Sequence, residues 1–277
     1  MQSDNCLNCN APLDASQQFC GTCGQKANTH RLTLSHFFHE FFHAFTHADK
    51  GIFHLLFALM IRPGTVAREY IEGKRKKYFN PFTFFLILMG IYVLSNRIFN
   101  PVPKEIHVPV GIMNIPDETV KSKTIAMFIR GGEVRNFTSA NGNIISMIAI
   151  PMIALIFWLS YKKRKYNYAE HLTANMMFTS FANIFFTLLV FPLQKLTAGS
   201  PYSFLITIIG LVLQVGYYTW AYTGMFQEKS FGGRLKIFGV SLLSVFVWTL
   251  FTLTMIAIYI YQSWDFYQFF VRMFNPR

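Results

Sequence analysis

The sequence predicts an all-α, multi-pass membrane protein with about five transmembrane helices, an N-terminal four-cysteine zinc ribbon and amphipathic interfacial helices. Hydrophobic residues make up 52% of the 277 residues and charged residues only 14%, whereas charged residues approach a quarter of an ordinary soluble domain. Five apolar runs are each long enough to cross a bilayer. All four cysteines lie in two CxxC pairs near the N-terminus.

Residues 1–29 form the predicted cytoplasmic zinc ribbon. The pairs are Cys6-x2-Cys9 and Cys20-x2-Cys23, and Gly24 follows the second pair. Two such knuckles bring four thiolates to one tetrahedral zinc ion, and glycine permits the tight turn. The alternatives are two disulfides, which need an oxidising compartment, and a thioredoxin-like redox pair, which usually belongs to a larger fold. Because four thiolates leave no open coordination position, we expect structural Zn²⁺.

Residues 30–81 are predicted to form an amphipathic collar that ends in a basic anchor. If residues 34–48 are helical, one face carries Leu34, Phe37, Phe38, Phe41 and Phe45. The opposite face carries His36, His39, Glu40, His43 and His47. A helix with an aromatic face and a polar face, placed ahead of transmembrane runs, is expected to lie flat on a membrane surface.

His39, Glu40 and His43 match the HExxH pattern, in which two histidines bind zinc and the glutamate activates water. Such a site also needs a third ligand, for which His47 or Asp49 is available, and a walled cleft. We therefore keep a catalytic site only as a remote alternative and predict no catalytic residues. A non-catalytic metal or pH-responsive face and the plain polar side of an interfacial helix are the other interpretations.

The collar continues with an apolar stretch, residues 51–61, which is too short to span because about 20 residues are needed. We predict a second interfacial or re-entrant helix that ends at Arg62-Pro63-Gly64, since proline disfavours helix in the preceding residue.

A functional polar cluster is also predicted on the cytosolic side. Its candidate members are His43, His47, Asp49, Arg62, Glu69, Glu170 and His171. For Glu170 and His171, at the start of the third apolar run, a satisfied interfacial pair without further function is the alternative interpretation.

The apolar runs cover residues 82–99, 144–161, 172–192, 203–225 and 237–261, within a predicted transmembrane domain of residues 82–277. Two basic clusters flank them: Lys74, Arg75, Lys76 and Lys77 before the first run, and Lys162, Lys163, Arg164 and Lys165 after the second. Such clusters mark cytosolic helix ends and attract anionic lipid headgroups. All five spans then thread in one orientation, which predicts a multi-pass membrane protein with a cytoplasmic N-terminus and an external C-terminus.

The only sizeable external segment in this arrangement is the loop of residues 100–143. Gly131-Gly132 and residues 141–143 are turn signals, and short β-branched stretches precede them. A small hairpin-like cap is therefore expected.

The spans contain almost no ionisable chemistry, since Arg97 is their only charged residue. Coupled transporters usually place acids, histidine or lysine within the membrane, so this composition counts against ion-coupled transport. Asn175, Asn183 and Gln214 are expected to hydrogen-bond between helices.

A family resemblance rests on residues from the zinc ribbon to Pro81. They are Cys20-Gly-Thr-Cys23-Gly-Gln-Lys, Phe45-Thr-His47-Ala-Asp49-Lys-Gly51, Arg62-Pro63-Gly64, Arg68-Glu69-Tyr70-Ile71, Gly73-Lys74-Arg75, Tyr78 and Pro81, with Glu170-His171-Leu172 as a second landmark. This pattern resembles a bacterial domain-of-unknown-function family of zinc-ribbon, multi-pass inner-membrane proteins. The resemblance implies an inner-membrane location and supplies no activity. The first histidine of HExxH is not part of that family's pattern, which weighs further against a protease.

The favoured function is that of a non-enzymatic membrane protein whose cytosolic zinc ribbon and collar bind a protein partner or sense the membrane surface. A channel, or a carrier for lipid or a small apolar solute, is the alternative, because Pro151, Gly210, Gly216 and Gly224 permit kinks and close helix contacts. Nucleic-acid tethering is disfavoured because the basic clusters lie against the bilayer, where anionic lipid is the nearer partner. The sequence predicts neither a ligand nor an oligomeric state.

Overall fold

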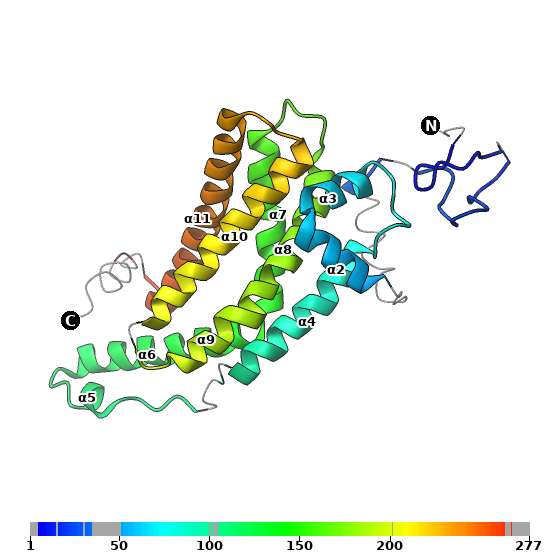
Figure 1. Ribbon diagram of the computed structural model, residues 1–277. Coiled ribbons are helices and arrows are strands. Elements are labelled where there is room, and N and C mark those ends of the chain that lie inside the picture. The colour runs from blue at the N-terminus through cyan, green and yellow to red at the C-terminus, as the bar shows by residue number, and fades with distance from the viewer. Residues whose placement is uncertain are drawn as a thin grey trace.

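The chain forms a body of long helices with a small irregular module at its N-terminal end (Figure 1). The computed structural model describes residues 5–14, 16–29, 31–34, 51–99, 101, 105–200, 202–263 and 267. The predicted collar helix, with His36, His39, Glu40, His43, His47 and Asp49, lies outside the described residues. We call the end of the helical body beside the N-terminal module the proximal end and the opposite end the distal end.

Two short helices, α2 (Ile52–Ile61) and α3 (Pro63–Ile71), form the proximal end. They break at Arg62, because Pro63 starts the new helix, as the sequence predicts. Leu55 and Leu59 of α2 are buried, whereas Phe53 and Phe57 are exposed. The helix is therefore apolar on both its packed and its open side, which suits a segment partly immersed in lipid.

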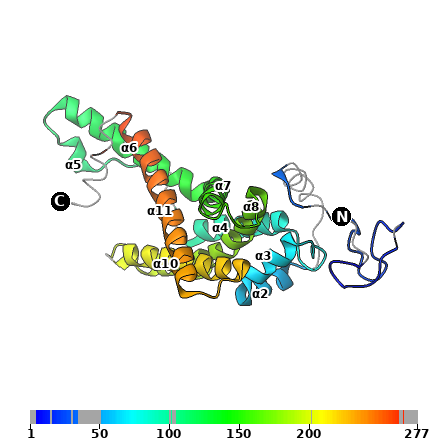
Figure 2. The same cartoon turned by 90° about the horizontal axis from the view of Figure 1, so that it is seen from above.

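Five long helical segments make up the body. They are α4 (Pro81–Phe99), α7 (Gly142–Ser160), α8 (Tyr168–Phe185) with its extension, α10 (Tyr202–Phe226) and α11 (Phe231–Tyr261). Segments α4, α8 and α11 run from the proximal to the distal end, and α7 and α10 return (Figures 1 and 2).

Four of these segments are each long and apolar enough to cross a membrane, namely Pro81–Phe99, Tyr168–Leu196, Tyr202–Phe226 and Phe231–Tyr261. A fifth is reached if α6 (Glu118–Ala140) and Ile144–Ser160, which meet at 79°, count as one broken span. The predicted fold class is confirmed: the described chain is all-helical, with four to five candidate spans and a four-cysteine cluster ahead of them.

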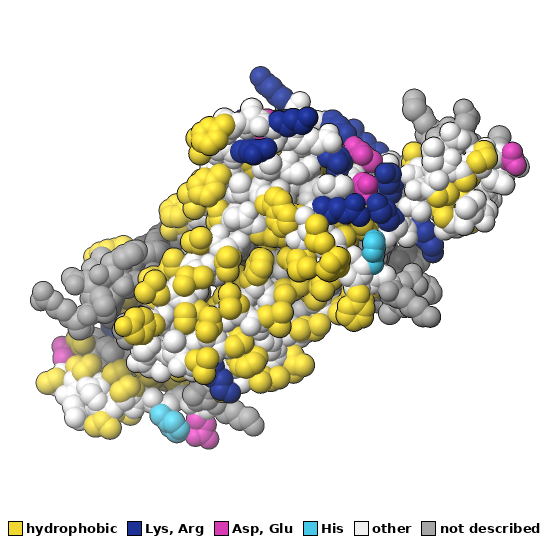
Figure 3. All heavy atoms as spheres, viewed as in Figure 1, with side chains coloured by type: hydrophobic (Ala, Val, Ile, Leu, Met, Phe, Trp, Pro, Cys, Tyr) yellow, Lys and Arg dark blue, Asp and Glu magenta, His cyan; other side chains and the backbone are white. Residues whose placement is uncertain are grey.

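The outer surface carries the pattern expected of a membrane protein. Figure 3 shows hydrophobic side chains over the middle of the body and most Lys and Arg side chains gathered at the proximal end. Leu94, Phe204, Val212 and Phe246 are each at least 60% exposed. A soluble protein seldom exposes so large an apolar surface.

The segment predicted as an external loop is mainly helical, so the hairpin-like cap was wrong. Short helix α5 (Val110–Met113) precedes α6, which lies across the distal end (Figure 1). The side chain of Asp117 caps α6 by accepting from the backbone N–H groups of Thr119 and Val120. At the other side, Arg130 donates to the carbonyl oxygen of Ile260, and Tyr259 donates to Glu133. These bonds tie α6 to the end of α11.

The extension of α8 contains one π-helical turn, η1 (Phe186–Val190), followed by α9 (Phe191–Leu196). The backbone N–H of Phe191 donates to the carbonyl of Phe186, which is the i→i+5 bond of a π-helix. The hydroxyl of Ser95 on α4 donates to the carbonyl oxygen of Thr187 at 3.1 Å. A neighbouring helix thus satisfies a carbonyl within the irregular turn.

A cluster of buried aromatic side chains lies in the proximal half of the body. Phe157, Phe178, Tyr218 and Tyr222 are fully buried there. The rings of Phe157 and Tyr222 stack with centroids 3.6 Å apart, and Phe178 meets Tyr222 edge-on. These aromatic contacts close the body at the proximal end.

Candidate metal centre and membrane-domain cavity

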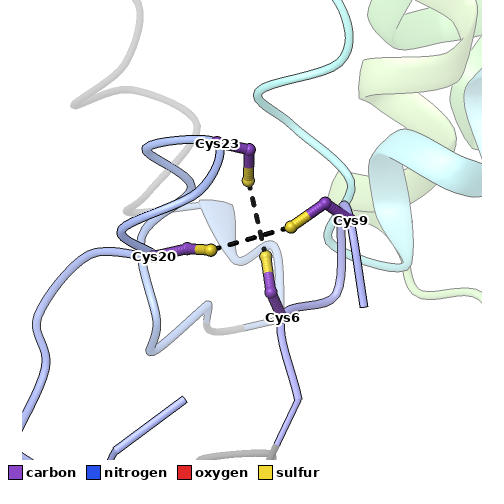
Figure 4. A group of neighbouring side chains, drawn as sticks. All are labelled: Cys6, Cys9, Cys20 and Cys23. Carbon is purple, nitrogen blue, oxygen red and sulfur yellow. Dashed lines mark hydrogen bonds between the residues drawn. The ribbon is translucent and has the colours of Figure 1, made fainter. Parts of the chain in front are cut away.

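The four cysteines converge on one point (Figure 4). The sulfur atoms of Cys6 and Cys23 are 3.6 Å apart, those of Cys9 and Cys20 are 3.7 Å apart, and all four lie within 4.8 Å of one another. Zn–S bonds of about 2.3 Å in a tetrahedron put the sulfurs about 3.8 Å apart, whereas a disulfide needs about 2.05 Å. The geometry therefore fits a tetrahedral metal ion, and the cluster can hold one such as zinc.

The two knuckles have the same local backbone. The carbonyls of Cys6 and Cys20 accept from the N–H groups of Asn10 and Gly24, each at 2.8 Å. Asn10 and Gly24 follow the second cysteine of their pairs and have positive φ angles of 63° and 70°. Glycine and asparagine tolerate this left-handed conformation best, so the predicted role of Gly24 holds and Asn10 repeats it.

Backbone N–H groups also stabilise the thiolate form of Cys20, which is the form that binds a metal ion. N–H groups of Cys23 and Thr22 bond the sulfur of Cys20 and lower the pKa of that thiol to about 6. A metal ligand must be deprotonated, so these backbone N–H groups favour the ligating form of Cys20.

The four-cysteine module and the segment that follows it contact the helical body, through Gln25 and Arg31 respectively. Arg31 makes a two-pronged contact with Glu170 at the start of α8, at 2.7 and 3.0 Å, and also donates to the Lys165 carbonyl. The backbone N–H of Lys76 donates to the Gln25 side chain at 2.8 Å. Glu170 is only 4% exposed, so the pair with Arg31 keeps a buried carboxylate compensated.

A second carboxylate network is centred on Glu69 of α3. Glu69 accepts hydrogen bonds from Lys77 at 2.7 Å and from the Tyr78 hydroxyl at 2.5 Å, and it pairs with Lys74 at 3.4 Å. Burial alone would raise the pKa of Glu69, but these donors outweigh it and lower the pKa to about 2. The described members of the predicted polar cluster therefore do not share one network, because Glu69 and Glu170 have different partners.

Much of the predicted basic anchor is engaged within the protein. Lys165 pairs with Glu72 at 2.7 Å, Arg164 pairs with Glu228 at 2.5 Å, and Lys162 lies over the Trp158 ring. These contacts join the loops of the proximal end. Lys76 and Lys163 keep exposed side chains.

His171 follows Glu170 in the first turn of α8 and is fully buried. Its Nδ1 is 3.4 Å from the hydroxyl of Tyr222, which also accepts from Asn175 at 2.5 Å. The interhelical bond predicted for Asn175 is present. The bond of Gln214 stays within α10, where it donates to Tyr218 at 3.5 Å, and Asn183 contacts the sulfur of Met89 at 3.6 Å.

A cavity of about 1130 Å³ opens between the helices of the distal half. Its polar wall includes Asn96, Ser139, Thr179, Asn183, Gln214 and Thr252, and its apolar wall includes Phe99, Ile153, Phe186, Leu211, Val245 and Trp248. Three of the lining residues are exposed to solvent at the distal end: Arg135, Lys195 and Gly199. The cavity therefore opens at that end.

The cavity lining reaches the aromatic core. Thr179 lines the cavity, and its hydroxyl is hydrogen-bonded at 2.7 Å to the hydroxyl of Tyr218. Tyr218 belongs to the fully buried group in the proximal half. The described lining therefore extends from the exposed distal end to this buried group.

Together these features define a multi-pass helical membrane protein with a four-cysteine module that can hold a metal ion at one end and an open cavity at the other. Residues 49–93 match the protein family described as "Protein of unknown function (DUF3667)". This match covers α2, α3, the first basic cluster and part of α4, where the sequence resemblance is most specific. Neither the curated proteins nor the solved structures contain a match to the chain.

Sequence reasoning missed the cavity. Its wall takes residues from six helical segments that are separated by as many as 161 positions, from Tyr92 to Leu253. Single Thr, Ser and Gln residues in apolar helices are common, and nothing local marks them as neighbours.

Proposed function

We propose that the chain is a non-enzymatic binding protein of the bacterial inner membrane. Its zinc module lies in the cytosol, its basic clusters contact anionic headgroups, and its helical domain holds a small apolar or amphiphilic ligand in the distal cavity. The observation that carries this proposal is the cavity of about 1130 Å³ within a bundle whose outer surface is apolar. Ligand sites are typically concave, largely apolar and furnished with a few polar groups, as this cavity is.

Retention of lipid or solute by the purified protein tests the binding function. Native mass spectrometry in a mild detergent should detect a bound small molecule on the wild type. Ser146→Trp, which places an indole in the cavity wall, should remove it, whereas Ile148→Trp on the lipid-exposed side of the same helix should not. Equal retention by both variants would count against the cavity as the site.

Structural Zn²⁺ on Cys6, Cys9, Cys20 and Cys23 is the second part of the proposal. It is supported by sulfur separations of 3.6 and 3.7 Å. Metal analysis should find one zinc per chain, lost in Cys20→Ser and retained in His39→Ala. Loss of zinc in His39→Ala would instead favour a site on the HExxH segment.

Docking of a cytosolic protein on the zinc module is a second candidate function. Phe19, which precedes Cys20, is 57% exposed on the module. A photo-crosslinking residue at Phe19 in living cells should capture one defined protein, and capture should stop in Cys20→Ser. A crosslinker at Asp14 on the same module is the control for random contact.

A further inference from the structure

The mouth of the cavity carries two cations without acidic partners. Arg135 of α6 and Lys195 of α9 both line it. Among the described residues neither makes an ion pair, and Lys195 contacts only the ring of Phe99, at 5.8 Å. No described residue of the cavity wall is Asp or Glu.

Neutral hydrogen-bonding groups surround the two cations. Asn96 and Ser139 lie on the wall and bond each other at 3.3 to 3.4 Å. Gln194 also lines it. Deeper inside, the hydroxyl of Thr252 is buried on the wall and has no partner among the described residues. Guanidinium, ammonium and such donors are the groups that bind phosphate oxygens.

The depth of the cavity matches one leaflet of a bilayer. On α10 its wall runs from Ser203 to Gln214, a rise of about 16 Å at 1.5 Å per residue. Half of a hydrocarbon core of about 30 Å is about 15 Å. The inner wall combines apolar Leu211, Val245 and Trp248 with neutral polar Thr179 and Gln214, whereas the cations lie at the mouth. Charge is therefore confined to the mouth, as it is to the headgroup of a lipid molecule.

We infer that the cavity binds a phosphate-bearing amphiphile of the distal leaflet, with its phosphate at Arg135 and Lys195 and its acyl chain directed toward Trp248. This inference rests on the proposed binding function and names the ligand class of the same cavity. The recognised chemistry, an anionic phosphate, is shared with free phosphate and soluble phosphate esters. The apolar depth favours the lipid as its source.

Lipid titration of the purified full chain tests the inference. Dioleoyl phosphatidylglycerol and dioleoylglycerol, which has the same acyl chains but no phosphate, are added separately in an uncharged detergent, and bound lipid is counted by native mass spectrometry. We expect about tenfold tighter binding of phosphatidylglycerol to the wild type. Arg135→Gln with Lys195→Gln should reduce this preference to about onefold.

A matched double variant separates the site from general surface charge. Arg97→Gln with Lys123→Gln removes two positive charges near the same end, but neither residue lines the cavity. The lipid preference should survive in this control. If it falls as far as in the cavity variant, the preference comes from the charged surface and the inference fails.

The source of the phosphate is tested by competition. Glycerol 3-phosphate and inorganic phosphate at 20 mM should leave bound phosphatidylglycerol in place. Displacement by either one would show that a free anion is sufficient for binding, and it would overturn the inference that the ligand is an amphiphile. If both lipids bind equally and Ser146→Trp removes both, the cavity still binds ligands but phosphate recognition is wrong. If neither lipid binds the wild type, the inference fails, whereas the proposed binding function is decided separately by the retention experiment with Ser146→Trp and Ile148→Trp.

Discussion

Among single residues, Glu69 has the clearest dependence on pH. Its pKa falls from an ordinary value of 4.5 to about 2, so its ionised form stabilises the folded protein. This contribution is complete above pH 4.5 and is lost as the pH falls toward 2.

We therefore expect Glu69→Gln to lower the unfolding temperature by about 2–4 °C at pH 7, the shift that about 1 kcal/mol gives in a chain of this size. The difference from the wild type should shrink as the pH falls from 5 to 3. Glu105→Gln is the control, because Glu105 is 81% exposed and, among the described residues, forms an ion pair only with exposed His107. A difference that stays constant across this pH range would show that Glu69 acts through packing alone. Thermal unfolding in detergent provides the measurement.

The residues that sequence reasoning located correctly are those whose neighbours are local. Cys6, Cys9, Cys20 and Cys23 converge because each pair is fixed by a four-residue turn. The environment of Glu170 was not predictable in the same way. Its partner Arg31 is 139 positions away, and an arginine in a polar linker gives no sign of a distant carboxylate.

Among the elements, the close crossing of α3 and α10 gives the sharpest test. A Cβ atom added at Gly64 would overlap the backbone of Ala221 and Met225. The side chain of Arg68 donates to the Gly224 carbonyl at 3.1 Å across the same crossing. The two helices can approach this closely only because Gly64 and Gly224 lack side chains.

Gly64→Ala should push α3 away from α10 and destabilise the protein by about 1–3 kcal/mol, the usual range for overpacking. Gly90→Ala in α4 is the matched control, since nothing lies within 4 Å of its added Cβ. That variant should be neutral or slightly stabilising, because alanine favours helix more than glycine does. Unfolding temperatures of both variants in the same detergent decide between these outcomes. Equal temperatures would mean that the crossing tolerates a methyl group.

Helix α6 shows why one element escaped sequence-based prediction. Gly131 and Gly132 suggested a turn, yet both lie within the helix, where Gly132 makes room for the side chain of Ile106. The overlooked signal was Asp117, whose side chain caps the first turn. The long apolar helices were easier to predict, because lipid exposure imposes a continuous composition on each of them.

For the whole molecule, the decisive prediction is its orientation. The basic clusters and the four-cysteine module lie at the proximal end, which should face the cytosol. An alkaline phosphatase fusion after residue 29 should be inactive, and one after residue 263 should be active. A green fluorescent protein fusion should give the opposite pattern. Activity of the first phosphatase fusion would invert the molecule and place the zinc module in an oxidising compartment.

The π-helical turn η1 also has a consequence for the distal half of the third span. An α-helix advances by about 100° per residue, and a π-turn accommodates one extra residue. Deleting Leu188 would restore regular winding and rotate everything beyond it by roughly that angle, carrying Gln194 and Lys195 off the wall that they now share. The position of Lys195 at the cavity mouth would then depend on the number of residues in the π-helical turn and not on the chemistry of its own side chain. A deletion that abolishes phosphatidylglycerol preference while every charged side chain remains would reveal this dependence.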